Sequence, residues 1–196
     1  STRSMPISNS EAKILRAHLD YLEQVRLTGN EGWGYVATID WGVTEIAAWV
    51  TLANLSSLRK AASEPIWGKD IAVAVSRIER DLDLLTQRQI ASGGWAPIKQ
   101  NDNPAYSRTY SSLMALWAII EAKNSPIIAE RIGKKYDNSI RDGIRWLLGS
   151  YNRERQTWVP NPERKQQTDS FPGLTAQALY VLERARSEFG TQLRAD

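Results

Sequence analysis

The chain has 196 residues, of which 42% are apolar and 24% are charged, and its formal net charge is +3, a composition typical of one compact globular domain. It contains no cysteine, which excludes disulfides, thiolate metal sites and cysteine nucleophiles and favours a reducing, cytoplasmic location. It has no run of roughly 18 apolar residues, the length that a membrane-spanning helix needs, and no secretory signal pattern.

Six segments carry apolar residues at helical spacing and are predicted to be main helices. In chain order they begin near Glu11, Val43, Asp70, Asn103, Asp137 and Asp169. Ser8 and Glu11 have the spacing of a capping box, and Asn103-Pro104 is typical of an N-cap followed by a first-turn proline. Connectors are expected at residues 61–69 and 123–136, the second with one short helix after Pro126. The fifth main helix is expected to extend to Tyr151. No segment alternates as a strand does, so the predicted class is all-α.

A loop with tryptophan recurs between paired helices. The tryptophans lie 62 and 63 residues apart, at Trp33, Trp95 and Trp158. A strongly apolar segment follows each loop and begins near a threonine. On this basis Thr44, Thr109 and Thr175 are aligned with one another. A fixed period of this kind indicates stacked structural units. We therefore predict one domain over residues 11–187 with three repeats (11–60, 70–123 and 137–187). Residues 1–10 and 188–196 would be tails, the first including residues left from cloning, because the chain does not begin with Met.

The two helices of each repeat differ in their apolar pattern. The first has one apolar stripe and a charged back, whereas the second is apolar nearly all round. A helix that is apolar all round is buried on several sides. Three outer helices would therefore cover three inner helices in two concentric layers, forming an arc or barrel of helical hairpins.

The run Gly93-Gly94-Trp95, the segment Tyr106–Leu116 and the segment Thr175–Leu182 follow one pattern. They resemble the repeat of squalene cyclases and protein prenyltransferase β-subunits. The resemblance implies an α/α toroid, which in those proteins usually has six hairpins around a central cavity. Three hairpins make half of such a ring, so a partial α/α toroid is expected. Another copy, another chain or the rest of a longer protein would complete it.

The resemblance also implies catalytic groups that this sequence lacks. Members of the family bind zinc through Asp, Cys and His, or protonate terpenoids with an Asp-x-Asp-Asp motif. The chain has a single histidine, His18, which we interpret as a packing residue on an apolar stripe. The string Asp81-Leu82-Asp83-Leu84 lacks the final Asp and falls on an outer helix. We therefore predict no metal, no cofactor and no catalytic residue of these kinds.

The loop after each tryptophan and the next helical turn would form the rim of the cavity. The rim candidates for binding a ligand or partner are Asp40, Trp41, Glu45, Asp102, Tyr106, Arg108, Tyr110, Asp169, Phe171 and Gln177. Carboxylates beside aromatic rings could hold a cationic or sugar-like ligand. The alternative is structural: the three aspartates would cap helices, and the recurring tryptophans would wedge hairpins together.

A basic segment is a further candidate site. Residues 131–165 include nine basic and four acidic residues. The candidates for contact are Arg131, Lys134, Lys135, Arg153 and Arg155. This excess could attract an acidic protein surface or a phosphate backbone. The alternative is that these side chains cover solvated helix faces.

Three functions stay open at this point. The favoured one is a non-catalytic recognition or regulatory domain of a larger protein, which binds a protein or peptide. The alternative is an enzyme of the terpenoid cyclase-like fold that acts on an isoprenoid or a carbohydrate at the inner rim, which would need Asp40, Asp102 and Asp169 to converge. Nucleic-acid binding comes last, because no nucleic-acid motif accompanies the basic segment.

Overall fold

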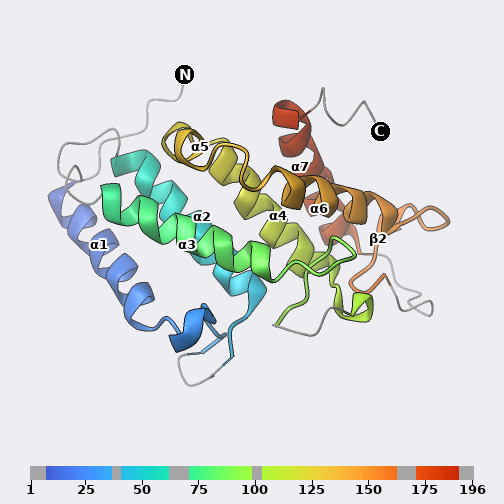
Figure 1. Cartoon of the computed structure of the whole chain (residues 1–196), viewed down its shortest axis with the longest axis horizontal. Coiled ribbons are helices and arrows are strands. Elements are labelled where there is room, and N and C mark those ends of the chain that lie inside the picture. The colour runs from blue at the N-terminus through green and yellow to red at the C-terminus, as the bar shows by residue number, and fades with distance from the viewer. Residues whose placement is uncertain (1–7, 37–40, 62–70, 99–102, 163–170, 190–196) are drawn as a thin grey trace.

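The computed structural model of this protein describes residues 8–36, 41–61, 71–98, 103–162 and 171–189. This part of the chain is mostly helical, with seven α-helices and one short β-hairpin (Figure 1). The helices are α1 (Asn9–Gln24), α2 (Thr44–Ala61), α3 (Ile71–Gln87), α4 (Thr109–Lys123), α5 (Pro126–Ile132), α6 (Asp137–Gly149) and α7 (Pro172–Phe189). Two 3-10 turns, η1 and η3, cover Thr28–Asn30 and Pro104–Tyr106. The hairpin pairs β1 (Tyr151–Asn152) with β2 (Thr157–Trp158) in antiparallel register.

The helical prediction is confirmed. The six predicted main helices are α1, α2, α3, α4, α6 and α7, and the short helix expected after Pro126 is α5. The hairpin corrects the prediction of a chain without strands, since two residues per strand are too few to show an alternating pattern. It also shortens the fifth main helix, because Tyr151 belongs to β1 and α6 ends at Gly149.

Local sequence sets the start of α1, whereas tertiary contacts set the start of α4. Ser8 and Glu11 form the predicted capping box: the Glu11 N–H donates to Ser8 Oγ (3.3 Å) and the Ser8 N–H donates to Glu11 Oε2 (2.7 Å). The helix predicted from Asn103 begins instead at Thr109, after the turn η3. The Thr109 N–H donates to the carbonyl oxygen of Pro160 (3.1 Å), so a distant loop takes the place of a local cap. The predicted starts at Asp70 and Asp169 lie outside the described residues.

Helices α2, α4 and α7 lie side by side with α4 in the middle, while α3 packs on α2 and α6 packs on α4. In Figure 1, α3 and α6 lie nearer the viewer than this layer. Most of α4 is buried, as expected for an apolar helix. Helix α7 differs, because Leu179 is 57% exposed and Tyr180 is 50% exposed, and no described element covers that side of it. Among the helices described, none is long and apolar enough to cross a membrane.

The recurring tryptophans occupy equivalent places after three helices. Each indole N–H donates to a backbone carbonyl near the end of the preceding helix, α1, α3 or α6: Trp33 to Leu22 (2.6 Å), Trp95 to Leu85 (2.7 Å) and Trp158 to Leu147 (2.7 Å). All three side chains are buried. These tryptophans therefore tie each loop to the helix before it, which is a packing role.

Threonines at the starts of α2 and α4 bond to the next tryptophan loop along the chain. Thr44 Oγ1 donates to the carbonyl oxygen of Ala96, directly after Trp95. Thr109 Oγ1 donates in the same way to Val159, directly after Trp158. The bond recurs because α2 and α4 each begin against such a loop.

The predicted alignment of Thr175 with Thr44 and Thr109 is wrong by three residues. Thr175 Oγ1 accepts from the N–H of Trp158 (3.3 Å), and Ser112 Oγ accepts from the N–H of Trp95 (2.8 Å), so Thr175 corresponds to Ser112. The position that corresponds to Thr109 is Pro172, the first residue of α7. The sequence alignment matched Thr175 to another threonine, Thr109. The structure matches it to Ser112, because a serine and a threonine hydroxyl accept the same hydrogen bond.

His18 also departs from its prediction. Its side chain is exposed, not packed in a core, and its Nδ1 lies 2.9 Å from the carbonyl oxygen of Ile14. The partner is the carbonyl four residues earlier on the same helix, so the ring lies along the helix surface.

Candidate functional site

A hollow of about 400 Å³ opens between α2, α4 and α7. Its lining residues are Trp49, Leu113, Met114, Trp117, Ala176, Gln177, Tyr180 and Val181. On α4, Leu116 approaches Gly143 of α6, whereas Leu113, Met114 and Trp117 line the hollow. Its volume is within the range of pockets that bind small ligands or side chains.

Three aromatic side chains, one from each helix, form the walls of the hollow. The ring centroids of Trp49 and Trp117 are 5.8 Å apart at an interplanar angle of 74°, and those of Trp117 and Tyr180 are 5.6 Å apart at 84°. These are edge-to-face contacts, which hold the rings in defined positions. Trp49 and Tyr180 are about half exposed. The indole nitrogen of Trp117 is buried without a hydrogen-bond partner among the described residues.

A charged cluster joins the same three helices. Glu121 of α4 accepts from Arg59 Nη2 of α2 (2.6 Å) and from Arg184 Nε of α7 (2.7 Å). Burial acts to raise the pKa of Glu121, but the hydrogen bonds and charges of the two arginines outweigh it and lower the pKa. The carboxylate therefore stays ionised at neutral pH and links α2, α4 and α7.

The first turn of α2 carries a buried carboxyl group, Glu45. Ser111 Oγ donates to Glu45 Oε1 (2.6 Å), while Oε2 is buried without a partner among the described residues. Burial raises the pKa of Glu45, against the opposing effects of the Ser111 hydrogen bond and the charge of Arg88. Burial also raises the pKa of Tyr35, and the charge of Glu45 adds to this effect. The carboxyl group could thus hold a proton or accept a hydrogen bond from a ligand.

Arg88 is the buried cation nearest to this carboxyl group. Its Nη2 donates to the carbonyl oxygen of Glu31 (2.5 Å), whereas Nε and Nη1 have no partner in the described part of the chain. Gly42 is required here, because a Cβ at that position would lie 2.4 Å from Arg88 Nη2 and 1.4 Å from the Glu31 oxygen. The glycine lets the segment before α2 pass close to the arginine.

The structure brings two of the predicted rim residues towards the hollow. Gln177 lines it directly, and Glu45 lies on α2 one helical turn before Trp49. The three predicted aspartates, Asp40, Asp102 and Asp169, lie outside the described residues.

The other rim candidates lie in the loops or, for Tyr110, in the first turn of α4. Trp41, Tyr106 and Tyr110 are 51%, 41% and 36% exposed. Arg108 donates to the carbonyl oxygens of Ala105 (2.9 Å) and Ser107 (3.0 Å), so it holds its own loop. Phe171 is partly buried just before α7.

The sequence analysis missed the main residues of the site. They are Trp49, Trp117, Tyr180, Arg59, Glu121 and Arg184. All lie within apolar helices, where aromatic side chains are usually core residues. A usable signal was present: Glu121 follows Trp117 by four residues and Arg184 follows Tyr180 by four, so each pair shares one helix face.

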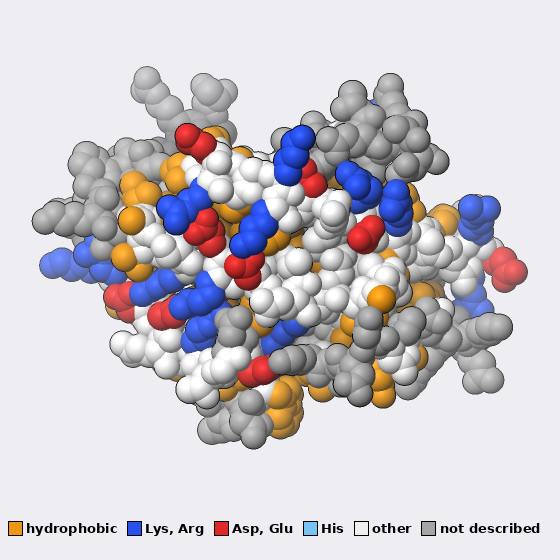
Figure 2. Space-filling view, in the orientation of Figure 1, with side chains coloured by type: hydrophobic (Ala, Val, Ile, Leu, Met, Phe, Trp, Pro, Cys, Tyr) orange, Lys and Arg blue, Asp and Glu red, His pale blue; other side chains and the backbone are white. Residues whose placement is uncertain are grey.

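The basic candidates do not form one patch. Arg131 pairs with Glu79 (2.7 Å) and Lys135 pairs with Asp83 (2.6 Å), both on α3, and the neighbouring Lys134 is exposed. The exposed Arg153 and Arg155 follow β1, at the other end of α6, a helix about 20 Å long. On the face shown in Figure 2, basic and acidic side chains are interspersed. The positive charge of the basic segment is therefore partly neutralised by acidic residues of α3, and the basic side chains are separated into two groups at the two ends of α6.

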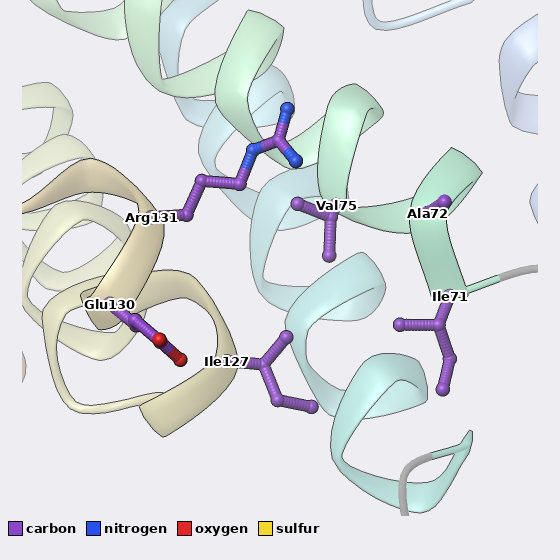
Figure 3. Close-up of a pocket in the computed structure, with 6 residues that line it drawn as sticks. All are labelled: Ile71, Ala72, Val75, Ile127, Glu130 and Arg131. Atoms are coloured by element: carbon purple, nitrogen blue, oxygen red, sulfur yellow. The ribbon is translucent and has the colours of Figure 1, made fainter.

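A second hollow, of about 580 Å³, lies between α3 and α5. Figure 3 shows Val75 and Ile127 on opposite sides of it and Arg131 reaching from α5 towards α3. Among the described residues its lining has no aromatic side chain, and Arg131 is already paired with Glu79. It offers fewer groups for recognition than the aromatic hollow.

The acidic string that approximates a cyclase motif lies elsewhere. Asp81 is fully buried on α3, where it accepts from Arg26 Nη1 (2.5 Å) and from Asn54 Nδ2 of α2 (3.4 Å). Burial raises its pKa to about 6, against the opposing hydrogen bond from Arg26. Asp81 does not line the hollow and instead connects α2, α3 and the segment after α1.

Comparison of this chain with models of protein families, with curated proteins and with solved structures finds no match. These comparisons therefore assign no family. A functional proposal has to depend on the chemistry of the hollow and of the charged groups beside it.

Proposed function

We propose that this chain is a non-catalytic recognition or regulatory domain of a larger protein, and that it binds a protein or peptide partner through the aromatic hollow. The observation that carries the proposal is the pair of half-exposed rings, Trp49 and Tyr180, held around an apolar floor of Leu113 and Met114. Aromatic residues in defined positions dominate the binding energy of protein interfaces. A cytoplasmic location, favoured by the lack of cysteine, is part of this proposal.

We further propose that the three repeats form part of an α/α toroid like that of squalene cyclases and prenyltransferase β-subunits. The recurring bonds of Thr44 and Thr109 support it, because each joins one repeat to the next in the same way. Helices α3 and α6 pack on α2 and α4, and none of their described residues lines the hollow, as expected of outer helices. In a toroid the hollow would face the centre of the ring, and the exposed Leu179 of α7 would meet a further unit.

The groups in the hollow favour recognition over catalysis. The described lining residues include no carboxyl, imidazole, amine or thiol group, and their polar side-chain groups are the Gln177 amide, the Tyr180 hydroxyl and two indole N–H groups. Such a lining orients and desolvates an apolar group, but it provides no general acid, base or nucleophile of ordinary strength.

A paired capture experiment tests the recognition function. Proteins bound from a cell extract are quantified for the wild-type chain and for the double variant Trp49→Ala/Tyr180→Ala. The matched control is Val73→Ala/Leu148→Ala, which removes two exposed apolar side chains from α3 and α6. We expect a partner that the wild type and the control retain and the hollow variant loses. Identical binding by all three proteins would contradict the proposal.

A second candidate function is an enzyme of the terpenoid cyclase-like fold, acting on an isoprenoid or a carbohydrate at the inner rim. The observation that favours it is Glu45, a buried carboxyl group with a raised pKa and an unpaired oxygen, which could donate a proton to a double bond or a glycosidic oxygen. The test is turnover of prenyl diphosphates, terpenoids and glycosides by the wild type and by Glu45→Gln. Turnover by the wild type that Glu45→Gln lacks would establish the enzymatic function and overturn the recognition function. No turnover by the wild type would refute the enzymatic function.

A further inference from the structure

A basic cluster continues the surface of the aromatic hollow. Glu121 lies four residues after Trp117 on α4, and Arg184 lies four residues after Tyr180 on α7. Residues four apart share a helix face and are separated by about 6 Å along the axis. Arg59 of α2 reaches the same carboxylate from the other side. The hollow therefore has an apolar aromatic part and, one helical turn away, a charged part.

The three side chains of the charged part together carry more positive than negative charge. Two guanidinium groups share one ionised carboxylate, so the sum over these three side chains is +1. The side chains of Arg59 and Arg184 are 46% and 36% exposed, whereas that of Glu121 is 9% exposed. The two cations are thus more exposed than the anion that they share. Among the described residues, Arg59 contacts Glu121 through Nη2, and its Nε and Nη1 are further donors that a ligand can use.

On the basis of the recognition function above, we propose that the partner is an acidic amphipathic peptide segment. A large apolar side chain of the segment would fill the hollow, and an Asp or Glu beside it would pair with Arg59 and Arg184. The separation of about 6 Å matches two residues of an extended peptide or four residues of a helical one. Guanidinium groups suit this role because they form charge-assisted hydrogen bonds with carboxylates.

A random-peptide display library selected on the full chain tests this chemistry without a known partner. We expect enriched peptides to carry a large apolar residue with Asp or Glu two or four positions away. The most enriched peptide is then synthesised with its acid intact and with that acid replaced by Gln or Lys. We expect the Gln peptide to bind about fivefold more weakly and the Lys peptide more weakly still, with a difference that shrinks at high salt.

Two variants of the chain separate recognition from a structural role. Arg59→Gln should remove most of the preference for the acidic peptide, while Glu121 keeps its contact with Arg184. Glu121→Gln should strengthen acidic-peptide binding, because it removes the negative charge beneath the arginines; a purely structural role of the cluster predicts weaker binding instead. Arg77→Gln is the matched control, since Arg77 lies on α3 and pairs with Asp20 (3.4 Å).

The outcomes distinguish this inference from the proposed function. Enrichment of apolar peptides with no acidic preference, or with a basic one, would overturn the inference and leave the recognition function standing. A library without enrichment, or one whose enriched peptides still bind Trp49→Ala/Tyr180→Ala, would overturn both. Binding of a fatty acid such as dodecanoate in the absence of peptide binding would assign the hollow to a small amphiphile and contradict the peptide partner.

Discussion

The same substitution, Trp to Phe, should have different consequences at two tryptophans. The indole N–H of Trp95 donates to the carbonyl oxygen of Leu85 (2.7 Å), and its side chain is fully buried. Trp95→Phe removes this hydrogen bond, which contributes about 1 kcal/mol, although the Leu85 oxygen still accepts from the Arg88 N–H (3.1 Å). The substitution also creates a small cavity, which costs about 1 kcal/mol more. The indole N–H of Trp117 has no partner among the described residues. Trp117→Phe therefore loses no hydrogen bond, and we expect its stability to stay within about 1 kcal/mol of the wild type.

Urea unfolding followed by far-ultraviolet circular dichroism measures both changes. With a denaturant slope of about 2 kcal/mol per M, Trp95→Phe should lower the unfolding midpoint by about 1 M, and Trp117→Phe should hardly move it. Trp41→Phe is the control, because Trp41 is 51% exposed. Equal losses at Trp95 and Trp117 would refute the reasoning, since the hydrogen bond would then contribute nothing to the difference.

Three further changes test other parts of the structure. Gly42→Ala should destabilise the fold by about 3 kcal/mol or prevent folding, because its Cβ would lie 1.4 Å from the Glu31 carbonyl oxygen. A Cβ at Gly149 meets nothing within 4 Å, so Gly149→Ala should stabilise the fold by about 0.5 kcal/mol. Equal effects of the two substitutions in chemical denaturation would contradict this. Glu121→Gln should lower the free energy of unfolding by about 1 kcal/mol at neutral pH. Because the pKa of Glu121 is lowered below 4.5 in the folded state, this loss should vanish as the pH falls through the folded pKa. A loss that persists in acid would refute the assignment. Burial raises the pKa of Glu45 above 4.5, so the stability of the wild type should fall as the pH rises through the folded pKa, and Glu45→Gln should become more stable relative to it. Parallel curves of stability against pH for the two proteins would contradict this.

Local pattern was sufficient to predict the helices. The spacing of apolar residues predicts a helix without knowledge of its neighbours, and the tryptophans at 33, 95 and 158 identified three equivalent loops correctly. The same reasoning was wrong about the start of α4 and the place of Thr175. Both depend on bonds to another segment, from Thr109 to Pro160 and from Trp158 to Thr175, which no local pattern contains.

The candidate site shows the same division between sequence and tertiary structure. The sequence by itself determined that α2, α4 and α7 are apolar helices at a regular period, because hydrophobic spacing depends only on the geometry of one helix. It did not determine which faces of these helices meet. Trp117 and Tyr180 are 63 residues apart, and only the packing of α4 against α7 brings their rings to 5.6 Å and places Arg184 beside Glu121. A binding surface built from three helices exists only after the helices have packed, so the tertiary structure alone decided where the hollow and its charges lie.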